Sequence, residues 1–197
     1  TSNVFSDCQE GIFMQGSSLA QIKNNTFNVP APVTPNTKTY GIFSVNSGGF
    51  DISGNTVNPV IPNLNAYGFI FENSGTTGGV VFNNTFNNVG IGLQAQKNNQ
   101  NLKAGCNFFN NPLNLSDEVV NVPSFPISTM KQQGLNCASN GNPAGNEWPY
   151  SCNASTSIAN IFVDAGVTFK YYSYNLNASS QPYTKPFCSS FIWEAAD

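Results

Sequence analysis

A short phrase recurs four times in the first part of the chain: a small or amide residue, then Asn, then one or two apolar positions. It reads KNNTF at 23–27, SGNTV at 53–57, FNNTF at 82–86 and GCNFF at 105–109. The Asn residues of successive copies are separated by 30, 29 and 23 residues. An internal period of this size is typical of solenoid proteins, in which each repeat is one structural unit.

Each copy of the phrase belongs to a longer unit with a constant internal order. A Gly followed by apolar residues begins the unit at residues 11, 41, 68 and 90. A polar turn, a second short apolar run and then the Asn phrase follow it, and the apolar end of the phrase begins a third run. Short apolar runs bounded by Gly, Asn and Ser indicate β-strands separated by turns. We find no useful stretch with the 3.6-residue period of a helix.

A unit of about 22 residues with three short strands cannot bury its own apolar face, but it can do so when stacked on its neighbours. We therefore predict an all-β fold, a right-handed parallel β-helix whose coils lie ~4.8 Å apart. Residues 1–115 would form about four coils, and residues 116–197 would continue the same domain less regularly and cap it. A β-sandwich is the alternative, but it gives no reason for four in-phase Asn phrases.

The repeated Asn is predicted to occupy one corner of the β-helix on successive coils. Asn tolerates the left-handed backbone of a sharp corner, and its amide can donate to one coil and accept from another. The resulting ladder would contain Asn25, Asn55, Asn84 and Asn107. The Thr residues of the phrase would point outward, and an apolar stack inside would contain Phe27, Val57, Phe86 and Phe108.

The longer repeats differ from the shortest one by Pro-rich insertions that follow the Asn phrase. These insertions read NVPAPVTPNTKT at 28–39 and NPVIPNLNA at 58–66. Insertions of this kind map to surface loops while the core of a solenoid stays in register. We therefore expect the two segments to project from one edge of the β-helix.

The composition restricts the possible partners. The 197 residues include seven Lys, ten acidic residues and no His, for a net charge of −3, and the chain contains no Arg. Without a basic patch that could neutralise phosphates, we expect no nucleic-acid partner. No apolar run approaches the ~18 residues of a membrane span, so we expect no membrane insertion. Few charges, much Asn and scattered Cys favour a secreted, oxidising location.

The five cysteines form no CxxC pair, and in a chain without His a zinc site is not expected. We predict a disulfide between Cys137 and Cys152, which flank the loop segment NGNPAGNEWPY. The pairing of Cys8, Cys106 and Cys188 stays open, and so does the alternative that all five are buried reduced thiols. No metal and no cofactor are expected.

The acidic residues are scattered along the chain. Glycosidases place two carboxyl groups ~5–9.5 Å apart, and the predicted coil register aligns neither Asp51 nor Glu72 with a second carboxylate. A Ser or Cys nucleophile would need a His or Lys base; the chain lacks His and contains no G-x-S-x-G motif. We therefore expect no catalytic residues and no enzyme activity.

Aromatic residues gather near the C-terminus. An exposed row formed by Tyr171, Tyr172, Tyr174 and Trp193 could bind the faces of sugars or a protein partner. The alternative is a cap that shields the open end of the core, which every solenoid needs.

Three segments carry a resemblance to a known group of proteins: CNFF at 106–109, AGNEW at 144–148 and KYYSYN at 170–175. Together with the repeats, they resemble secreted right-handed β-helix proteins of Bacteroidetes, many of which the type IX secretion system exports to the cell surface. The resemblance spans roughly residues 5–175. It implies an extracellular or cell-surface location and implies no common activity.

These observations predict a structural, adhesin-like extracellular module without catalysis. Its partners would be neighbouring domains of the same longer chain, together with glycans or surface proteins. The alternative is a carbohydrate-binding or carbohydrate-active β-helix of the polysaccharide lyase or hydrolase kind, which a metal-bound carboxylate cluster or a deep groove along the β-helix would favour.

Overall fold

The computed structural model describes residues 2–35, 37–110 and Asn146 with their side chains, and the backbone of four further strands between residues 116 and 195. Every named element of this described part is a β-strand. Most of its strands are short, as the sequence predicts, but Thr39–Val45, Asn63–Glu72 and Val89–Gln96 have 7, 10 and 8 residues.

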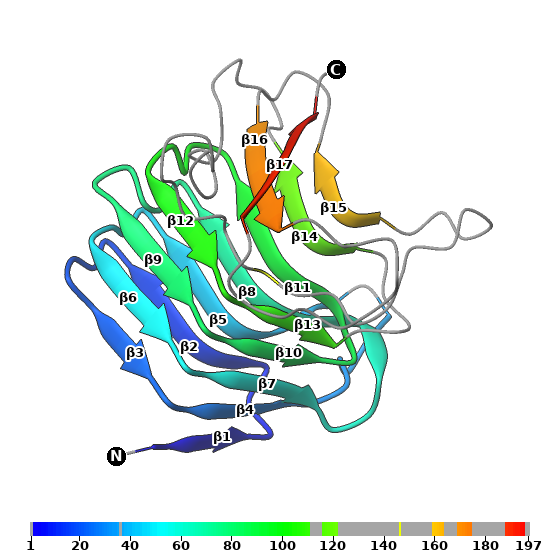
Figure 1. The fold of residues 1–197 in the computed structure, drawn as a ribbon. Coiled ribbons are helices and arrows are strands. Elements are labelled where there is room, and N and C mark those ends of the chain that lie inside the picture. The colour runs from blue at the N-terminus through cyan, green and yellow to red at the C-terminus, as the bar shows by residue number, and fades with distance from the viewer. Residues whose placement is uncertain are drawn as a thin grey trace.

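Three parallel sheets run along the molecule, and each winding of the chain adds one strand to each of them (Figure 1). The first sheet contains β1 (Val4–Ser6), β4 (Thr26–Val29), β7 (Thr56–Pro59), β10 (Thr85–Asn87) and β13 (Phe108–Asn110). The second sheet begins with β2 (Glu10–Gln15), β5 (Thr39–Val45), β8 (Asn63–Glu72) and β11 (Val89–Gln96). The third sheet contains β3 (Gln21–Lys23), β6 (Phe50–Ser53), β9 (Gly79–Phe82) and β12 (Leu102–Gly105).

Three successive strands, one from each sheet, make one coil. We number the coils 1 to 4, from β1–β2–β3 to β10–β11–β12, and β13 begins the next winding. All strand pairs between coils are parallel. The fold is therefore a parallel β-helix of about four turns, which confirms the predicted fold class.

The second sheet continues beyond the four coils. In it, β14 (Ser116–Asn121) pairs in parallel with β11, and β15 (Ala159–Val163) pairs in parallel with β14. The two remaining strands, β16 (Phe169–Tyr174) and β17 (Cys188–Ala195), form an antiparallel pair in which Tyr171 lies opposite Trp193. An antiparallel pair departs from the coil pattern, whereas β14 and β15 follow it.

Phenylalanine side chains fill the space that the three sheets enclose. The largest side chains with almost no exposure include Phe27, Phe50, Phe69, Phe71, Phe86 and Phe109. Behind the first sheet, the Phe86 and Phe109 rings stack with centroids 5.1 Å apart. Our prediction of Phe108 in this stack was wrong by one residue. The register pairs Phe108 with Thr85, whose side chain points outward, and pairs Phe109 with Phe86.

Glycines stacked on successive coils of the second sheet let its backbone pack closely against the adjoining coil and the core side chains. A Cβ on Gly68 would overlap the carbonyl oxygen of Gly92 and would lie 2.5 Å from the Phe86 ring. Gly92 thus follows Gly68 in the stack, and the prediction that Gly90 starts the fourth unit was wrong. The pairing between β8 and β11 shifts register between Val89 and Ile91, and this irregularity displaces the glycine stack from Gly90.

The coils differ in length mainly at the corner between the first and second sheets. In coil 4 the single residue Asn88 joins β10 to β11, whereas residues 30–38 join β4 to β5. Residues 60–62 join β7 to β8, and the irregular start of β8 adds further length. The Pro-rich segments therefore lie at one edge of the stack, as predicted.

Candidate functional site

The predicted Asn ladder is present and buried. The backbone N–H and the Nδ2–H of Asn25 both donate to Oδ1 of Asn55, at 2.9 and 3.0 Å. Asn55 makes the same two bonds to Asn84, and Asn84 makes them to Asn107, all at 3.0 Å. These four side chains are 6, 1, 1 and 0% exposed. Each buried amide is thus satisfied by the adjoining coils, which burial of a polar group requires.

The ladder is longer than the repeat predicted. Asn3 donates its N–H and Nδ2–H to Oδ1 of Asn25, both at 3.1 Å. At the other end, Asn107 donates to Oδ1 of Asn146 at 2.9 and 3.1 Å. Asn3 lies 22 residues before Asn25, the length of a coil without insertions, and this spacing was a signal for it. Asn146 follows Asn107 by 39 residues, and because this spacing is longer than any between the repeated phrases, the period did not indicate it.

The sharp turn at this corner is made one residue before the ladder. Positive φ angles occur at Asn24 (57°), Gly54 (68°), Asn83 (60°) and Cys106 (51°). The prediction that the ladder Asn itself adopts the left-handed conformation was therefore wrong. Gly and Asn are the residue types that accept this conformation most readily, which explains why Gly or Asn directly precedes the ladder Asn in three of the four phrases.

A second ladder lies where the second sheet meets the third. The backbone N–H of Ser17 donates to Oγ of Ser47, that of Ser47 donates to Oγ of Ser74, and that of Ser74 donates to Oδ1 of Asn99. Ser47, Ser74 and Asn99 are 3, 0 and 0% exposed. We did not predict this ladder, because its members change from Ser to Asn and their spacing varies.

Two acidic residues of the coils make exposed ion pairs. Asp51 Oδ2 lies 2.5 Å from Lys23 Nζ, and Glu72 Oε1 lies 2.5 Å from Lys97 Nζ. The Lys23 hydrogen bond lowers the pKa of Asp51. On the adjoining coils Asp51 has Gln21 and Val80 as its cross-strand neighbours, so no second carboxylate faces it there.

The outer side of the second sheet carries a further apolar cluster. Tyr67, Ile70 and Ile91 are buried there, and Tyr40 and Phe43 pack against them. Lys38 Nζ lies 4.6 Å from the centre of the Tyr67 ring, and burial raises the pKa of Tyr40. Strands that are apolar on both faces are typical of sheets covered on both sides.

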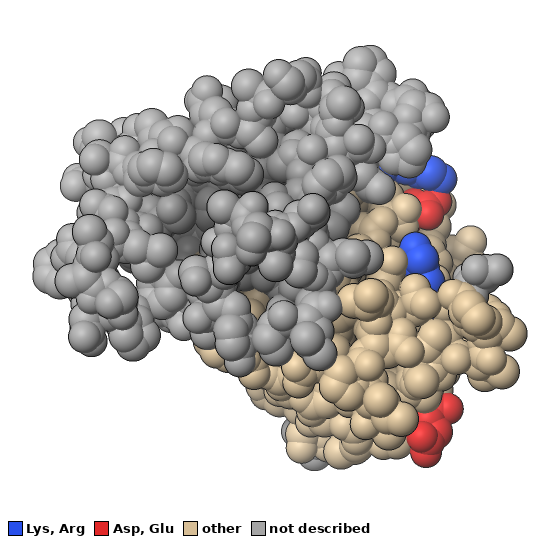
Figure 2. Space-filling model, turned by 90° about the vertical axis from the view of Figure 1, so that its right-hand side faces the viewer, with Lys and Arg blue, Asp and Glu red and all other residues tan. Residues whose placement is uncertain are grey.

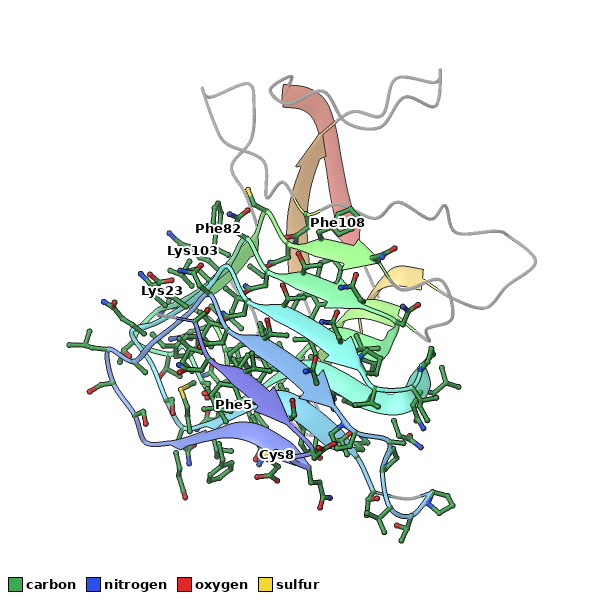
Figure 3. All side chains as sticks on the ribbon, turned by 90° about the horizontal axis from the view of Figure 1, so that it is seen from below. Phe5, Cys8, Lys23, Phe82, Lys103 and Phe108 are labelled. Carbon is green, nitrogen blue, oxygen red and sulfur yellow. The ribbon has the colours of Figure 1, made fainter. Side chains whose placement is uncertain are left out.

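Several predicted site residues cannot be placed. Cys137 and Cys152 lie outside the described residues, so the disulfide stays a prediction. Tyr171, Tyr172, Tyr174 and Trp193 lie in β16 and β17, of which the backbone alone is described. Cys8 is an exposed free thiol near the start of coil 1 (Figure 3).

The two Pro-rich segments form a surface feature, which we call the corner ridge and define as the described residues 30–35, 37–38 and 60–65. Thr39 Oγ1 donates to the carbonyl of Pro30 at 2.8 Å and closes the first segment. Asn65 Nδ2 donates to the carbonyl of Pro35 at 3.1 Å and joins the two segments across neighbouring coils. The ridge is therefore one connected surface.

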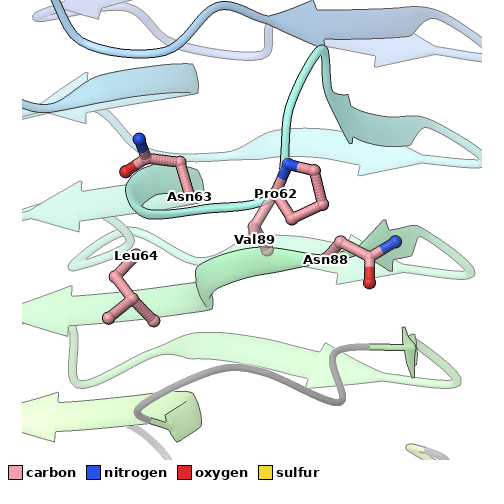
Figure 4. Close-up of a pocket in the computed structure, with 5 residues that line it drawn as sticks. All are labelled: Pro62, Asn63, Leu64, Asn88 and Val89. Atoms are coloured by element: carbon pink, nitrogen blue, oxygen red, sulfur yellow. The ribbon is translucent and has the colours of Figure 1, made fainter.

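Large apolar side chains project from the corner ridge. Val33 is 94% exposed, and Val60, Ile61 and Leu64 are 59, 61 and 47% exposed. Leu64 also lines a hollow of about 230 Å³, together with Pro62, Asn63, Asn88 and Val89 (Figure 4). Exposed apolar patches are candidate interaction surfaces, and these four side chains come from one surface feature.

The corner ridge is almost free of charge. Residues 24–37 and 52–71 contain no Asp, Glu, Lys or Arg, and Lys38 is the one charged residue of the ridge. The side of the molecule that faces the viewer in Figure 2 shows few charged side chains, which lie along one edge of the described surface. A partner of this ridge would therefore be bound mainly through apolar contact.

A comparison with known protein families identifies the family to which the chain belongs. Residues 1–151 match the family described as periplasmic copper-binding protein (NosD). The chain belongs to the NosD family. No curated protein and no solved structure matches it. The Bacteroidetes source and the type IX export route that the sequence resemblance implies are not part of the NosD match and stay predictions.

The name of the NosD family raises the question of a copper site in this member. Copper is bound by thiolate, thioether and imidazole donors, and this chain has no His, two Met and five Cys, of which Cys8 and Cys106 lie among the described residues. Met14 is 5% exposed and packs against apolar residues of the core, which are not metal ligands. The described residues contain no group of three or more His, Cys, Asp and Glu side chains that could hold a metal. They therefore do not fit a copper site.

Within the described part of this NosD-family chain, no helix has the length and apolar character needed to cross a membrane.

Proposed function

We propose that the chain is a non-catalytic β-helix module of a protein located outside the cytoplasm, and that it presents the corner ridge to a protein partner. The location rests on the family description as periplasmic. The display role rests on the ridge itself, which is exposed, uncharged apart from Lys38, and held on a rigid scaffold.

Rigidity is the property that makes the corner ridge suitable for binding. Five prolines, at positions 30, 32, 35, 59 and 62, restrict the backbone in and beside the two segments. The hydrogen bond between Asn65 and Pro35 adds a link between coils. A surface that is ordered before binding loses less conformational entropy on association.

The observation that carries the proposal is the exposure of Val33, Ile61 and Leu64 on the corner ridge, where Leu64 also lines the hollow. A protein surface of apolar character would bury these side chains, which at ~25 cal/mol per Å² is a favourable change. A strongly charged ligand would gain little here, because no charge of the ridge other than Lys38 could pair with it.

A direct test compares two double variants of the purified protein on arrays of cell-envelope proteins, matrix proteins and glycans. Val33→Ser with Ile61→Ser removes apolar surface from the ridge. Val80→Ser with Phe82→Ser removes exposed apolar surface from the third sheet, where the two side chains are 39 and 44% exposed against 94 and 61% for Val33 and Ile61. All four positions are exposed, so both variants should fold normally.

We expect the wild-type protein and the third-sheet variant to bind the same array protein, and the ridge variant to lose that binding. Equal binding by both variants would contradict the display role of the ridge. Turnover of a polysaccharide on the array, abolished by one Asp or Glu substitution, would favour the alternative of a carbohydrate-active β-helix.

A further inference from the structure

The hollow at the corner ridge arises from an irregularity in the second sheet. Residues 64–66 of β8 face the single residue Gly90 of β11, because the register shifts there. A Cβ on Gly90 would overlap the carbonyl oxygen of Leu64, so this glycine lets the displaced backbone of β8 lie directly against β11. Irregularities of this kind are over-represented beside functional sites, where they re-aim side chains.

Hydrogen bonds hold both walls of the hollow. On one wall, Asn63 Oδ1 accepts the N–H of Asn65 at 2.8 Å, and Asn65 Nδ2 donates to the carbonyl of Pro35 at 3.1 Å. On the other wall, the N–H of Asn88 donates to the carbonyl of Asn110 at 3.0 Å. The hollow is therefore formed before any partner binds, which lowers the entropic cost of association.

The volume of the hollow selects the size of its occupant. At about 230 Å³ it is smaller than the ~300–1,000 Å³ pockets that hold whole small-molecule ligands. It is larger than an apolar cavity of ~150 Å³, which is sufficient for benzene. The space therefore matches one aromatic side chain better than a free cofactor or metabolite.

The charge distribution restricts the type of side chain further. The residues that most often anchor protein interfaces are Trp, Tyr and Arg. All the described lining residues belong to residues 52–71 and 73–96, which contain no Asp, Glu, Lys or Arg. A guanidinium inserted here would be buried without a carboxylate to pair with, which is costly. Trp and Tyr remain.

Two side-chain amides lie at the hollow and can pair with the polar end of such a ring. Asn63 and Asn88 lie on opposite sides of Pro62 and Val89 (Figure 4). Among the described residues, neither Asn63 Nδ2 nor the side chain of Asn88 makes a hydrogen bond. A buried indole N–H or phenol O–H needs a hydrogen-bond partner, and an amide can both accept and donate.

We propose that the hollow is the anchor pocket of the corner ridge, and that the partner protein inserts one Trp or Tyr side chain into it. The ring contacts Pro62, Leu64 and Val89, and its N–H or O–H bonds to the amide of Asn63 or Asn88. Because Pro62, Asn63 and Leu64 belong to the ridge, the pocket and the ridge form one continuous surface. The identity of the partner as a protein rests on the proposed display role, whereas the preference for an aromatic group does not.

Titration of amino-acid amides, followed by NMR of the complete protein, tests that preference without any partner. The probes are N-acetyl-tryptophanamide and N-acetyl-tyrosinamide, and the comparison compounds are N-acetyl-leucinamide and N-acetyl-argininamide. We expect the aromatic probes to shift the side-chain amide signals of Asn63 and Asn88 saturably, with a Kd of the order of 1–10 mM. The comparison compounds should bind at least about tenfold more weakly. Equal shifts with all four compounds, or no saturable shift with the aromatic ones, would overturn the proposal.

Substitution of Leu64 tests whether the probes occupy the hollow. Leu64→Trp places a ring of the protein itself at the hollow and should abolish binding of the aromatic probes. The matched control is Val60→Trp, because Val60 is an exposed ridge residue that does not line the hollow; Val60 and Leu64 are 59 and 47% exposed. Retained binding in Leu64→Trp, or equal loss in both variants, would contradict the pocket. Circular dichroism checks the fold. If Leu64→Trp does not fold, Leu64→Ser should weaken binding at least about fivefold and Val60→Ser should not.

The partner found on the protein array separates this inference from the display role. Loss of that partner in both the Val33→Ser, Ile61→Ser variant and Leu64→Trp supports the ridge and the pocket together. Loss in the double variant alone leaves the display role standing and refutes the anchor pocket. Retention by both variants refutes both. If the array yields no partner, the display role fails and the amide titration alone decides the pocket.

Discussion

Removal of the Asn84 amide tests the ladder most directly. Asn84→Ala deletes the Oδ1 that accepts from the N–H and Nδ2–H of Asn55. It also deletes the Nδ2–H that donates to the Ile52 carbonyl and to Oδ1 of Asn107. The side-chain amide of Asn55 keeps two carbonyl acceptors. The backbone N–H of Asn55 and the carbonyl of Ile52 lose their hydrogen bonds to Asn84. Water does not readily replace these bonds, because Asn84 is 1% exposed.

The size of the effect follows from these two groups. A buried group that loses its hydrogen bond costs ~1–3 kcal/mol, so the substitution should lower the free energy of unfolding by ~2–6 kcal/mol. This is a large part of the ~5–15 kcal/mol that stabilises a typical domain. Backbone strain should add nothing, because the positive φ belongs to Asn83 and not to Asn84.

The matched control is Asn87→Ala in the same coil. Asn87 also bonds to amides of both neighbouring coils, donating to Asn58 at 2.8 Å and accepting from Asn110 at 3.0 Å, but it lies on the outer side of the first sheet. Water can replace these bonds, so the cost should stay below ~1 kcal/mol. Urea unfolding followed by circular dichroism measures both variants. Equal unfolding midpoints would refute the ladder as the element that stabilises this corner.

Three other substitutions test neighbouring features of the coils by the same unfolding assay. Asn83→Ala should cost ~1–2 kcal/mol and Asn83→Gly should cost little, because the position has a φ of 60°; equal costs would contradict the corner assignment. Gly68→Ala should cost ~1–3 kcal/mol or more through overlap with Gly92 and Phe86, and a wild-type midpoint would contradict the close packing. The lowered pKa of Asp51 means that its pair with Lys23 stabilises the protein above the ordinary Asp pKa and is lost as the pH falls through the lowered value. Asp51→Asn should remove this loss of stability at low pH and should change the free energy of unfolding at pH 7 by less than ~1 kcal/mol. If the variant lost stability on acidification as the wild-type protein does, the prediction would be contradicted.

The sequence predicted the ladder because the chemistry of its corner is restrictive. A buried side chain that must donate along the stack and accept from the opposite direction is best supplied by an amide, so Asn25, Asn55, Asn84 and Asn107 repeat without variation. The period then gave the coil length and the fold class. The second ladder was not predicted, because either a hydroxyl or an amide oxygen can accept the single backbone N–H at that corner. Its positions, Ser17, Ser47, Ser74 and Asn99, therefore share no single residue type.

Local register was harder to predict than the period. Phe108 and Phe109 are adjacent and chemically identical, so only the count from Asn107 distinguishes the outward from the inward side chain. The choice of Gly90 over Gly92 failed for another reason. An irregular stretch at the start of β8 shifts the register at Val89, and the sequence carries no clear signal for such a shift.

The position of the insertions explains how coils of unequal length remain aligned. Successive ladder residues are separated by 30, 29 and 23 residues, yet their hydrogen bonds are 2.9–3.0 Å long at each step. The extra residues lie in the corner ridge, between the first and second sheets, whereas the ladder lies between the third and first sheets. Because the two corners are separate, the length and composition of the ridge can change while the ladder keeps the coils in register. A surface that can vary in this way on a fixed scaffold is suited to the recognition of a partner.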